Sequence, residues 1–302
     1  MDWQPRPLRL DPADLNGLSK NLIVSHHTNN YAGAIRRLGA IRTQLEQLDW
    51  PSAPVFVING LKREELIAAN SAWLHELYFD TLGGSGALPD AGFAVAMARD
   101  FESVDHWRAE FTAMAKAMGG GSGWALLSWS TREARLLNHW AADHTNLLAG
   151  ATPLLALDMY EHAYHLDFGA KVAAYVDAFM QNIRWEAVVQ RYSAAIEADA
   201  GKWSVSPENV RDASQVVDVR RAAAYALAAD RIANSVWCDP ARLNTWSRDL
   251  DGSKPVVVYC VHGHDVSQST ALALRALGLD ARFVVGGIEA CRAAGIPLEP
   301  KG

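Results

Sequence analysis

Asp158 and His162 are of the types that bind a redox-active metal ion, and their spacing could place both at one point. Asp158 ends an apolar run, residues 153–157, that predicts a short buried strand. A bare carboxylate in that position is unfavourable, so it needs a hydrogen-bond donor or a cation. Carboxylate and imidazole together suit iron or manganese. The alternative is a helix-capping aspartate beside a core histidine.

Further histidines on two predicted helices would complete such a site. His26 and His27 lie on one amphipathic segment, and His75 lies on another, residues 64–82. Each is surrounded by apolar residues, where an unpaired imidazole is costly to bury. Either His26 or His27 could supply a ligand from the first segment.

Cys260 is the second candidate for chemistry. It follows a strand predicted over residues 254–259 and precedes a helix predicted over 268–277. Loop amides and the helix dipole stabilise a thiolate in such a position. His262 and His264 would add hydrogen-bond donors when protonated. The alternative is a buried, inert cysteine.

The elements that would position these groups change type along the chain. Helices are predicted over residues 15–50 (one broken helix or two), 64–82 and 104–118, and strands over 124–129, 135–140 and 153–157. A helical pattern then starts near His162 and continues through Phe179. Helices first, then a small antiparallel sheet with helices, predict an α+β domain.

The length of 302 residues predicts two domains, at roughly 150 residues each. We expect the first at residues 1–195, a polar linker without periodicity at 196–212, and the second at 213–302. In the second, strand, loop and helix alternate, which predicts an α/β unit with a parallel sheet.

Composition narrows the class of protein. A hydrophobic content of 50% and a charged content of 21% are typical of a soluble globular protein, and a net charge of −6 argues against nucleic acid or a membrane as partner. The N-terminus lacks the apolar segment of a signal peptide. The three cysteines, Cys238, Cys260 and Cys291, lie only in the last third, which favours a reducing compartment, the cytoplasm.

Short motifs in the first two-thirds of the chain resemble those of iron/manganese superoxide dismutases. Asp158-x-x-Glu161-His162-Ala163-Tyr164 is similar to the C-terminal signature of that family. Residues 25–28 and 73–79 resemble its two helical ligand segments, and 121–125 and 182–186 match further motifs in the same order. The resemblance covers about residues 1–195. It implies a helical hairpin with a small antiparallel sheet, and dismutation of superoxide to hydrogen peroxide and oxygen.

The resemblance also implies roles for individual residues. The ligands of one iron or manganese ion would be His26, His75, Asp158 and His162. A match without gaps from His26 to Leu38 favours His26 over His27. Glu161 would reach across a subunit interface, which implies a homodimer or a tetramer. Trp124 and Tyr164 would belong to the apolar shell that controls solvent access and tunes the metal.

The first helix departs from the family pattern. A histidine and a tyrosine usually follow the first ligand at successive turns, but Asn30 and Ala34 stand there. Tyr31 is the candidate to act in their place. One residue round a helix turns a side chain by roughly 100°, so Tyr31 could substitute only if the helix is locally different.

The usual glutamine beside the metal is also absent. Ser71 stands at its position on the second helix. The later candidate position falls at Asp143 or at His144, depending on a gap of one residue. An aspartate there would alter the metal's potential more than a histidine, because it brings charge. The remaining histidines, His106, His139 and His165, are expected on the surface or in the core.

The last ninety residues resemble a single-domain rhodanese, over about residues 213–295. The matching pieces are residues 217–220, the loop after Cys260, and residues 286–289. The resemblance implies that Cys260 carries a persulfide cradled by the loop, which contains His262, Gly263, His264 and Ser267, with a small sulfur donor and a thiol acceptor. Asp265 departs from the commonest loop, because it brings a negative charge close to an anionic donor.

Three hypotheses therefore compete. The first is a superoxide dismutase fused to a rhodanese-like domain, acting in bacterial oxidative or metal-oxyanion stress. The second is a metal-binding scaffold with little dismutase activity, whose main chemistry is sulfur transfer through Cys260. The third is a pair of non-catalytic assembly domains. Asn30 and Ala34 are the residues that separate the first hypothesis from the second.

Overall fold

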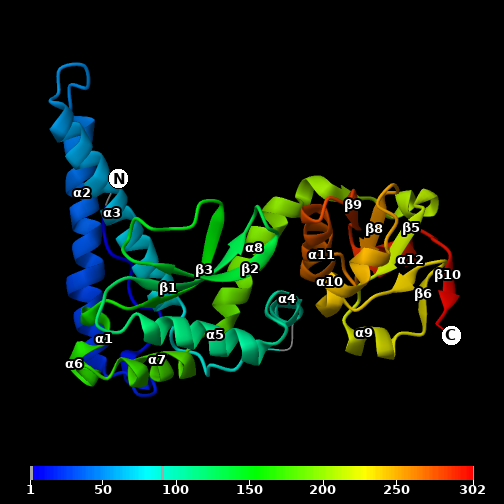
Figure 1. The fold of residues 1–302 in the computed structure, drawn as a ribbon, viewed down its shortest axis with the longest axis horizontal. Coiled ribbons are helices and arrows are strands. Elements are labelled where there is room, and N and C mark those ends of the chain that lie inside the picture. The colour runs from blue at the N-terminus through cyan, green and yellow to red at the C-terminus, as the bar shows by residue number, and fades with distance from the viewer. Residues whose placement is uncertain (1–2, 90–91, 302) are drawn as a thin grey trace.

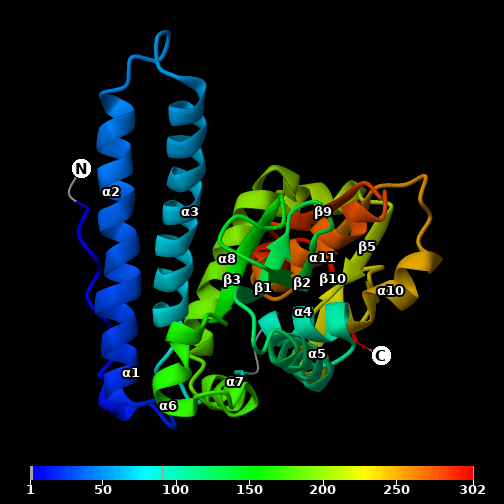
Figure 2. The ribbon, with the colours of Figure 1, turned by 60° about the vertical axis from the view of Figure 1, so that its left-hand side comes forward.

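The computed structural model describes residues 3–89 and 92–301, and its N-terminal part is a long antiparallel helical hairpin (Figure 1, Figure 2). After the short η1 (Pro12–Asp14), the first arm consists of α1 (Lys20–Ser25), a π-helical turn η2 (His26–Tyr31) and α2 (Ala32–Glu46), and the second arm is α3 (Val55–Asp80). Ser19 caps α1, because its side chain accepts a hydrogen bond from the N–H of Leu22. The predicted helices of this region are confirmed.

The tip of the hairpin is stabilised by a small core of its own. Leu38, Ile41 and Leu45 of α2 pack there against Ala68 and Ala69 of α3. The hairpin base joins the main hydrophobic core through residues on both arms. This packing fixes the two arms side by side, and it is at the base that they carry His26 and His75.

A three-stranded antiparallel sheet follows, with the order β2-β1-β3. Its strands are β1 (Trp124–Ser130), β2 (Arg135–Ala141) and β3 (Ala151–Asp158). Every residue of the central strand β1 is buried, and Trp124 pairs with Asp158 at the end of β3. The three predicted strands are confirmed, and the register places the end of β3 beside the start of β1.

Helices surround this sheet. They are α4 (Gly92–Phe101), α5 (Val104–Ala117), η3 (Glu161–Ala163), α6 (His165–Phe168), α7 (Val172–Gln181) and α8 (Trp185–Ala200). The predicted helix over 104–118 is confirmed as α5. The continuous helical pattern expected from His162 to Phe179 is wrong, because the chain breaks into η3, α6 and α7. Gly169 ends α6 with φ of 52°, a conformation that side chains disfavour.

The C-terminal part contains a five-stranded sheet in the order β4-β9-β8-β5-β7, whose recorded pairings are all parallel. Its strands are β4 (Ser204–Val205), β5 (Gln215–Asp218), β7 (Val236–Trp237), β8 (Val256–Tyr259) and β9 (Ala281–Val284). An antiparallel pair, β6 (Asp230–Ile232) with β10 (Leu298–Pro300), lies beside it. The other elements are η6 (Pro240–Arg242), η7 (Ser247–Asp249), α9 (Ala222–Leu227), α10 (Leu243–Trp246), α11 (Asp265–Ala276) and α12 (Gly287–Ala293). The predicted α+β unit followed by an α/β unit is confirmed.

Residues 196–212, which the sequence predicts as an irregular linker, are structured. Helix α8 continues through Ala200, η4 (Gly201–Trp203) follows, and β4 pairs with β9 before η5 (Pro207–Asp212). Ile196, Val205 and Val210 are buried, so this segment packs against both parts of the chain. These residues therefore form the end of a helix, a short strand and a turn, and not the irregular linker that the sequence predicts.

One hydrophobic core extends across the two parts of the chain. It includes Phe93 and Tyr192 from the N-terminal part and Leu272 and Leu274 from α11. Helices α4 and α8 lie against the C-terminal part, where α8 packs on α11 (Figure 1). Within residues 3–89 and 92–301, no helix combines the length and apolar character needed to cross a bilayer.

Candidate metal centre and cysteine loop

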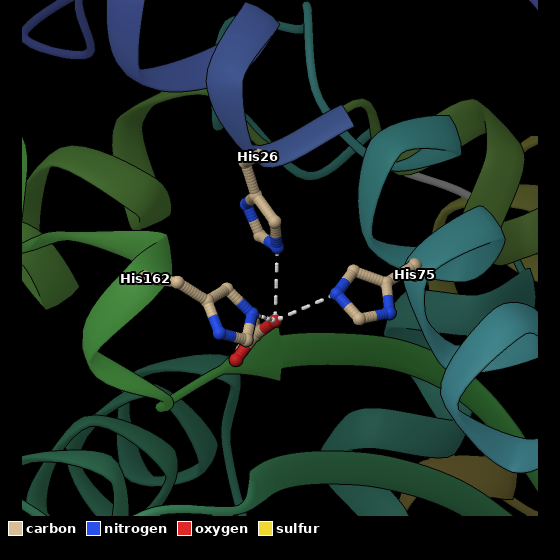
Figure 3. A group of neighbouring side chains, drawn as sticks. His26, His75 and His162 are labelled. Carbon is tan, nitrogen blue, oxygen red and sulfur yellow. Dashed lines mark hydrogen bonds and ion pairs between the residues drawn. The ribbon is translucent and has the colours of Figure 1, made fainter. Parts of the chain in front are cut away.

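Four side chains from separate elements meet at the base of the hairpin (Figure 3). His26 comes from the start of η2, His75 from α3, Asp158 from the end of β3 and His162 from η3. Their ligand atoms all lie within 4.8 Å of one another. The structure thus brings together the four residues for which the sequence predicts metal binding, which we call the metal cluster.

The three imidazoles converge on a single carboxylate oxygen. The Nε2 atoms of His26, His162 and His75 lie 3.0, 3.2 and 3.4 Å from Oδ2 of Asp158. His26, His75 and Asp158 are buried, whereas 28% of the His162 side chain is exposed. His162 therefore forms the solvent side of the cluster.

Hydrogen bonds outside the cluster orient two of its members. His75 donates from Nδ1 to the carbonyl oxygen of Ser71 at 2.6 Å. The other oxygen of Asp158, Oδ1, accepts from the N–H of Tyr160 at 2.9 Å. In a neutral ring that donates through Nδ1, Nε2 carries a lone pair. The lone pair of His75 thus faces Oδ2 of Asp158, an arrangement that is favourable when a cation lies between them.

The electrostatics of the cluster favour the protonation states that metal ligands need. Burial lowers the pKa of His75 to about 3 and also lowers the pKa of His26. Burial alone would raise the pKa of Asp158, but the charge of His162 and the hydrogen bonds from His162 and His26 outweigh it and hold that pKa below its usual range. The ionised carboxylate of Asp158 and the neutral rings of His26 and His75 belong to a nitrogen and oxygen set suited to an iron or manganese ion.

His27, the rival first ligand, lies outside the cluster. Its Nε2 donates to the carbonyl oxygen of Arg6 at 2.8 Å, and its ring is 5.1 Å from that of Tyr31. The geometry therefore places His26, and not His27, beside Asp158.

The π-helical turn explains how Tyr31 can lie beside the cluster. Within it, the N–H of Ala32 bonds to the carbonyl of His27, five residues back, which accommodates one extra residue per turn. The Tyr31 ring is buried, with its centroid 6.4 Å from that of His75. Its hydroxyl donates to Oε1 of Glu76 at 2.9 Å and accepts from the N–H of Arg6. Burial raises the pKa of Tyr31 to about 12.

His144, rather than Asp143, faces the metal cluster. Nε1 of Trp124 donates to Nδ1 of His144 at 3.0 Å, and the His144 ring centroid lies 6.3 Å from that of His75. Asp143 instead accepts hydrogen bonds from Thr145 in an exposed turn. Burial lowers the pKa of His144.

Tyr160 is a site residue that the sequence reasoning missed. Its ring stacks on His144 at 4.9 Å and on His162 at 5.5 Å, and so it bridges a ligand and its neighbour. Its position between Asp158 and His162 in the signature could have indicated it. Glu76, the hydrogen-bond partner of Tyr31, was missed as well, and it directly follows His75.

The other predicted positions are distributed as follows. Glu161 is exposed next to His162, while Tyr164 is buried with its ring 5.3 Å from that of Tyr175. Ser71, at the glutamine position, contacts His75. The remaining histidines are, as expected, on the surface or partly buried away from the cluster: His106, His139 and His165.

Cys260 lies in a tight loop between β8 and the N-terminus of α11. Its Sγ is 3.2 Å from Oγ of Ser267, a residue in the first turn of α11, and the thiol is almost fully buried. Gly263 has φ of 71°, and a Cβ there would lie 2.5 Å from the carbonyl oxygen of Val284. A glycine is therefore required for the loop to close over β9. His262 and His264 are exposed at its rim.

Comparisons with known proteins agree with this geometry. The family model of the iron/manganese superoxide dismutase C-terminal domain matches residues 89–191, and that of the rhodanese-like domain matches residues 206–294. A superoxide dismutase [Fe] of Cupriavidus metallidurans is 60% identical over 196 residues, which are 65% of this chain and 99% of that protein.

More distant relatives carry either metal in their names. A superoxide dismutase [Fe] of Aquifex pyrophilus is 32% identical over 63% of this chain and 91% of its own length. A superoxide dismutase [Mn] 1 of Halobacterium salinarum is 37% identical over 41% of this chain and 62% of its own length. Taken with the metal cluster and the cysteine loop, these matches show that the chain belongs to the iron/manganese superoxide dismutase family and continues into a rhodanese-like domain.

Proposed function

We propose that the N-terminal part of the chain catalyses the dismutation of superoxide to hydrogen peroxide and oxygen. The observation that carries this proposal is the convergence of three imidazole Nε2 atoms on one buried carboxylate oxygen. An iron or manganese ion, when bound, supplies the one-electron redox chemistry. The protein supplies the ligands, the protons and a site from which most water is excluded.

Tyr31 and His144 are the residues that we assign to proton supply. With its pKa raised to about 12, Tyr31 keeps its proton at neutral pH. His144 accepts from Trp124 at Nδ1, so in its neutral form it carries a proton on Nε2. Formation of hydrogen peroxide consumes two protons, and the two groups come from separate parts of the chain, Tyr31 from the first helical arm and His144 from the turn after β2.

A subunit contact would complete the N-terminal site. Glu161 is exposed beside His162, the one partly exposed member of the metal cluster. We propose that Glu161 binds His162 of a second copy, which gives a homodimer or a tetramer. We also propose a cytoplasmic location, which the three free thiols support, and a role in bacterial oxidative or metal-oxyanion stress.

For the C-terminal part we propose sulfur transfer through a persulfide on Cys260. Its Sγ lies 3.2 Å from Oγ of Ser267 in the first turn of α11, and a cysteine beside a helix N-terminus is in a position typical of reactive thiols. The alternative function for the whole chain is a metal-binding scaffold with little dismutase activity. The specific observation that favours it is the presence of Asn30 and Ala34. The family usually has a histidine and a tyrosine at these positions, and neither Asn30 nor Ala34 has the chemistry of those side chains.

Superoxide consumption by the purified full chain, expressed per bound iron or manganese ion, tests the first proposal. We expect rapid consumption that is lost in His162→Ala. A fully metal-loaded protein that consumes superoxide no faster than free metal ions would favour the scaffold alternative.

The second proposal, sulfur transfer, is tested by exposing the protein to a sulfur donor and looking for a persulfide on Cys260. No persulfide should form in Cys260→Ser.

A further inference from the structure

A cavity of about 580 Å³ lies in front of Cys260, at the boundary between the two parts of the chain. Its C-terminal side is formed by the cysteine loop and the start of α11. Its other wall comes from the N-terminal part, through Ser193 and Glu197 of α8 together with Gly92. The cavity is thus completed by a helix that belongs to the dismutase family region.

Direct contacts hold this wall in place. Oγ of Ser193 donates to Oδ2 of Asp265 at 2.8 Å. The buried Arg99 of α4 donates to the carbonyl oxygen of Ser269 in α11 at 3.2 Å. A Cβ on Gly92 would lie 3.2 Å from the side chains of Asp265 and Val266, so α4 approaches α11 closely. The continuous core beneath these contacts makes the wall a fixed part of the site.

Glu197 from α8 and Asp265 from α11 bring two carboxylates to the cavity lining, and Arg221 brings a guanidinium group. Arg220 also lines it, but its guanidinium is bound at Nε to both oxygens of the buried Asp218, at 3.0 and 2.9 Å. The charge of Arg220 is therefore neutralised locally. With Asp218 counted, the carboxylates around the cavity outnumber the guanidinium groups by three to two, so the lining favours a positively charged group over a doubly negative inorganic donor.

We propose that the sulfur donor for Cys260 is a small organic persulfide that carries an ammonium group, and that Glu197 and Asp265 bind this group. The inference rests on the proposed sulfur transfer through Cys260. The cavity volume falls in the range of about 300–1,000 Å³ typical of small-molecule sites. Because the Cys260 thiol is almost fully buried between two walls, a small compound reaches it more readily than a protein surface does.

The reaction balances without a further reactant. The Cys260 thiolate attacks the terminal sulfur of the donor R–S–SH, a new sulfur–sulfur bond forms on Cys260, and the sulfur–sulfur bond of the donor breaks. The products are the Cys260 persulfide, which keeps the proton, and the thiolate R–S⁻. A thiolate acceptor then attacks the terminal sulfur and releases the Cys260 thiolate. No net oxidation or reduction takes place.

The test compares donors that differ in the ammonium group. Full-length protein reacts with the persulfides of cysteine and cysteamine, which have the ammonium group, and with that of N-acetylcysteine, which lacks it. The measurement is kcat/KM for release of the donor thiol, with addition of one sulfur to Cys260 checked by mass spectrometry. We expect both ammonium donors to react roughly three- to fivefold faster than N-acetylcysteine persulfide, the size of a partly exposed ion pair.

Charge-neutral variants assign the effect to the two carboxylates. Glu197→Gln and Asp265→Asn should each reduce the preference for ammonium donors. Glu186→Gln, the same change on an exposed residue of α8 outside the cavity, should keep it. An unchanged preference in Glu197→Gln and Asp265→Asn, no preference in the unmodified protein, or a preference for thiosulfate would overturn the inference. If no donor, thiosulfate included, places sulfur on Cys260, the proposed sulfur transfer itself is wrong.

Discussion

Tyr31 holds a proton beside the metal cluster because its hydroxyl is buried and hydrogen-bonded to Glu76. The π-helical turn that carries it also carries His26, so one local irregularity positions both a ligand and its neighbour. Irregular turns of this kind are frequent at functional sites. At the scale of single residues, we therefore expect fast dismutation to depend on Tyr31.

Replacing Tyr31 by phenylalanine should slow superoxide consumption about tenfold or more, because general acid catalysis by one group contributes at least that much in most enzymes. Metal content should stay the same, since Tyr31 is not a ligand. The measurement is the rate per bound ion. Tyr225→Phe, the same change in the C-terminal part, is the control and should leave the rate unaltered. Equal rates for Tyr31→Phe and the unmodified protein would exclude Tyr31 as proton donor.

Cys238 and Cys291 should react slowly with iodoacetamide at pH 8. Burial raises the pKa of each thiol to about 11, so roughly one molecule in a thousand carries the thiolate at that pH. The reactive fraction rises with pH, and labelling of both should accelerate as the pH approaches 11. Mass spectrometry of the alkylated peptides between about pH 7 and pH 10, where a thiol of raised pKa is still mostly protonated, measures this. Rapid labelling of Cys291 at pH 7 would contradict the structure.

At the scale of elements, Gly169 ends α6 and separates it from α7, shortly after the turn η3 that carries His162. Its φ of 52° and ψ of −123° lie in a region open essentially to glycine alone. We expect Gly169→Ala to lower the free energy of unfolding by about 1–3 kcal/mol, measured by denaturant titration. Gly201→Ala is the matched control, because Gly201 has helical angles and open space around its Cβ position. It should be neutral or slightly stabilising; equal losses in both variants would contradict the explanation.

Local patterns indicate three members of the metal cluster, whereas the choice of His26 over His27 comes from the family resemblance alone. Asp158 and His162 follow a buried strand, and His75 lies on an amphipathic helix. The π-helical turn could not be predicted, since the extra residue is accommodated by packing of the hairpin base rather than by any local residue preference. The same holds for residues 196–212, whose few apolar side chains are buried by distant parts of the chain.

At the scale of the whole molecule, the core that joins α4, α8 and α11 couples the two parts of the chain. Metal binding stabilises the native state by mass action. Removal of the ion with a chelator should therefore lower the melting temperature of the C-terminal part as well. Labelling of the buried Cys291 during heating reports on that part. Loss of structure in the N-terminal part alone, with Cys291 still protected at the same temperature as before, would show that the shared core does not couple them.

The two proposed chemistries should nevertheless be independent at their reacting groups. Cys260 belongs to the C-terminal loop, whereas the metal cluster lies at the hairpin base of the N-terminal part. We expect Cys260→Ser to abolish sulfur transfer and to leave superoxide consumption per bound ion unchanged. A parallel loss of both activities would mean that Cys260 takes part in the dismutase reaction.

The central claim is that the metal cluster makes this chain a superoxide dismutase. The most direct test is to titrate the metal-free full chain with iron or with manganese and to follow superoxide consumption by rapid mixing at each step. We predict a rate that rises in proportion to bound metal up to one ion per chain with at least one of the two metals, and that stays at the background level in His162→Ala. Binding of one ion per chain without any rise in rate would contradict the claim.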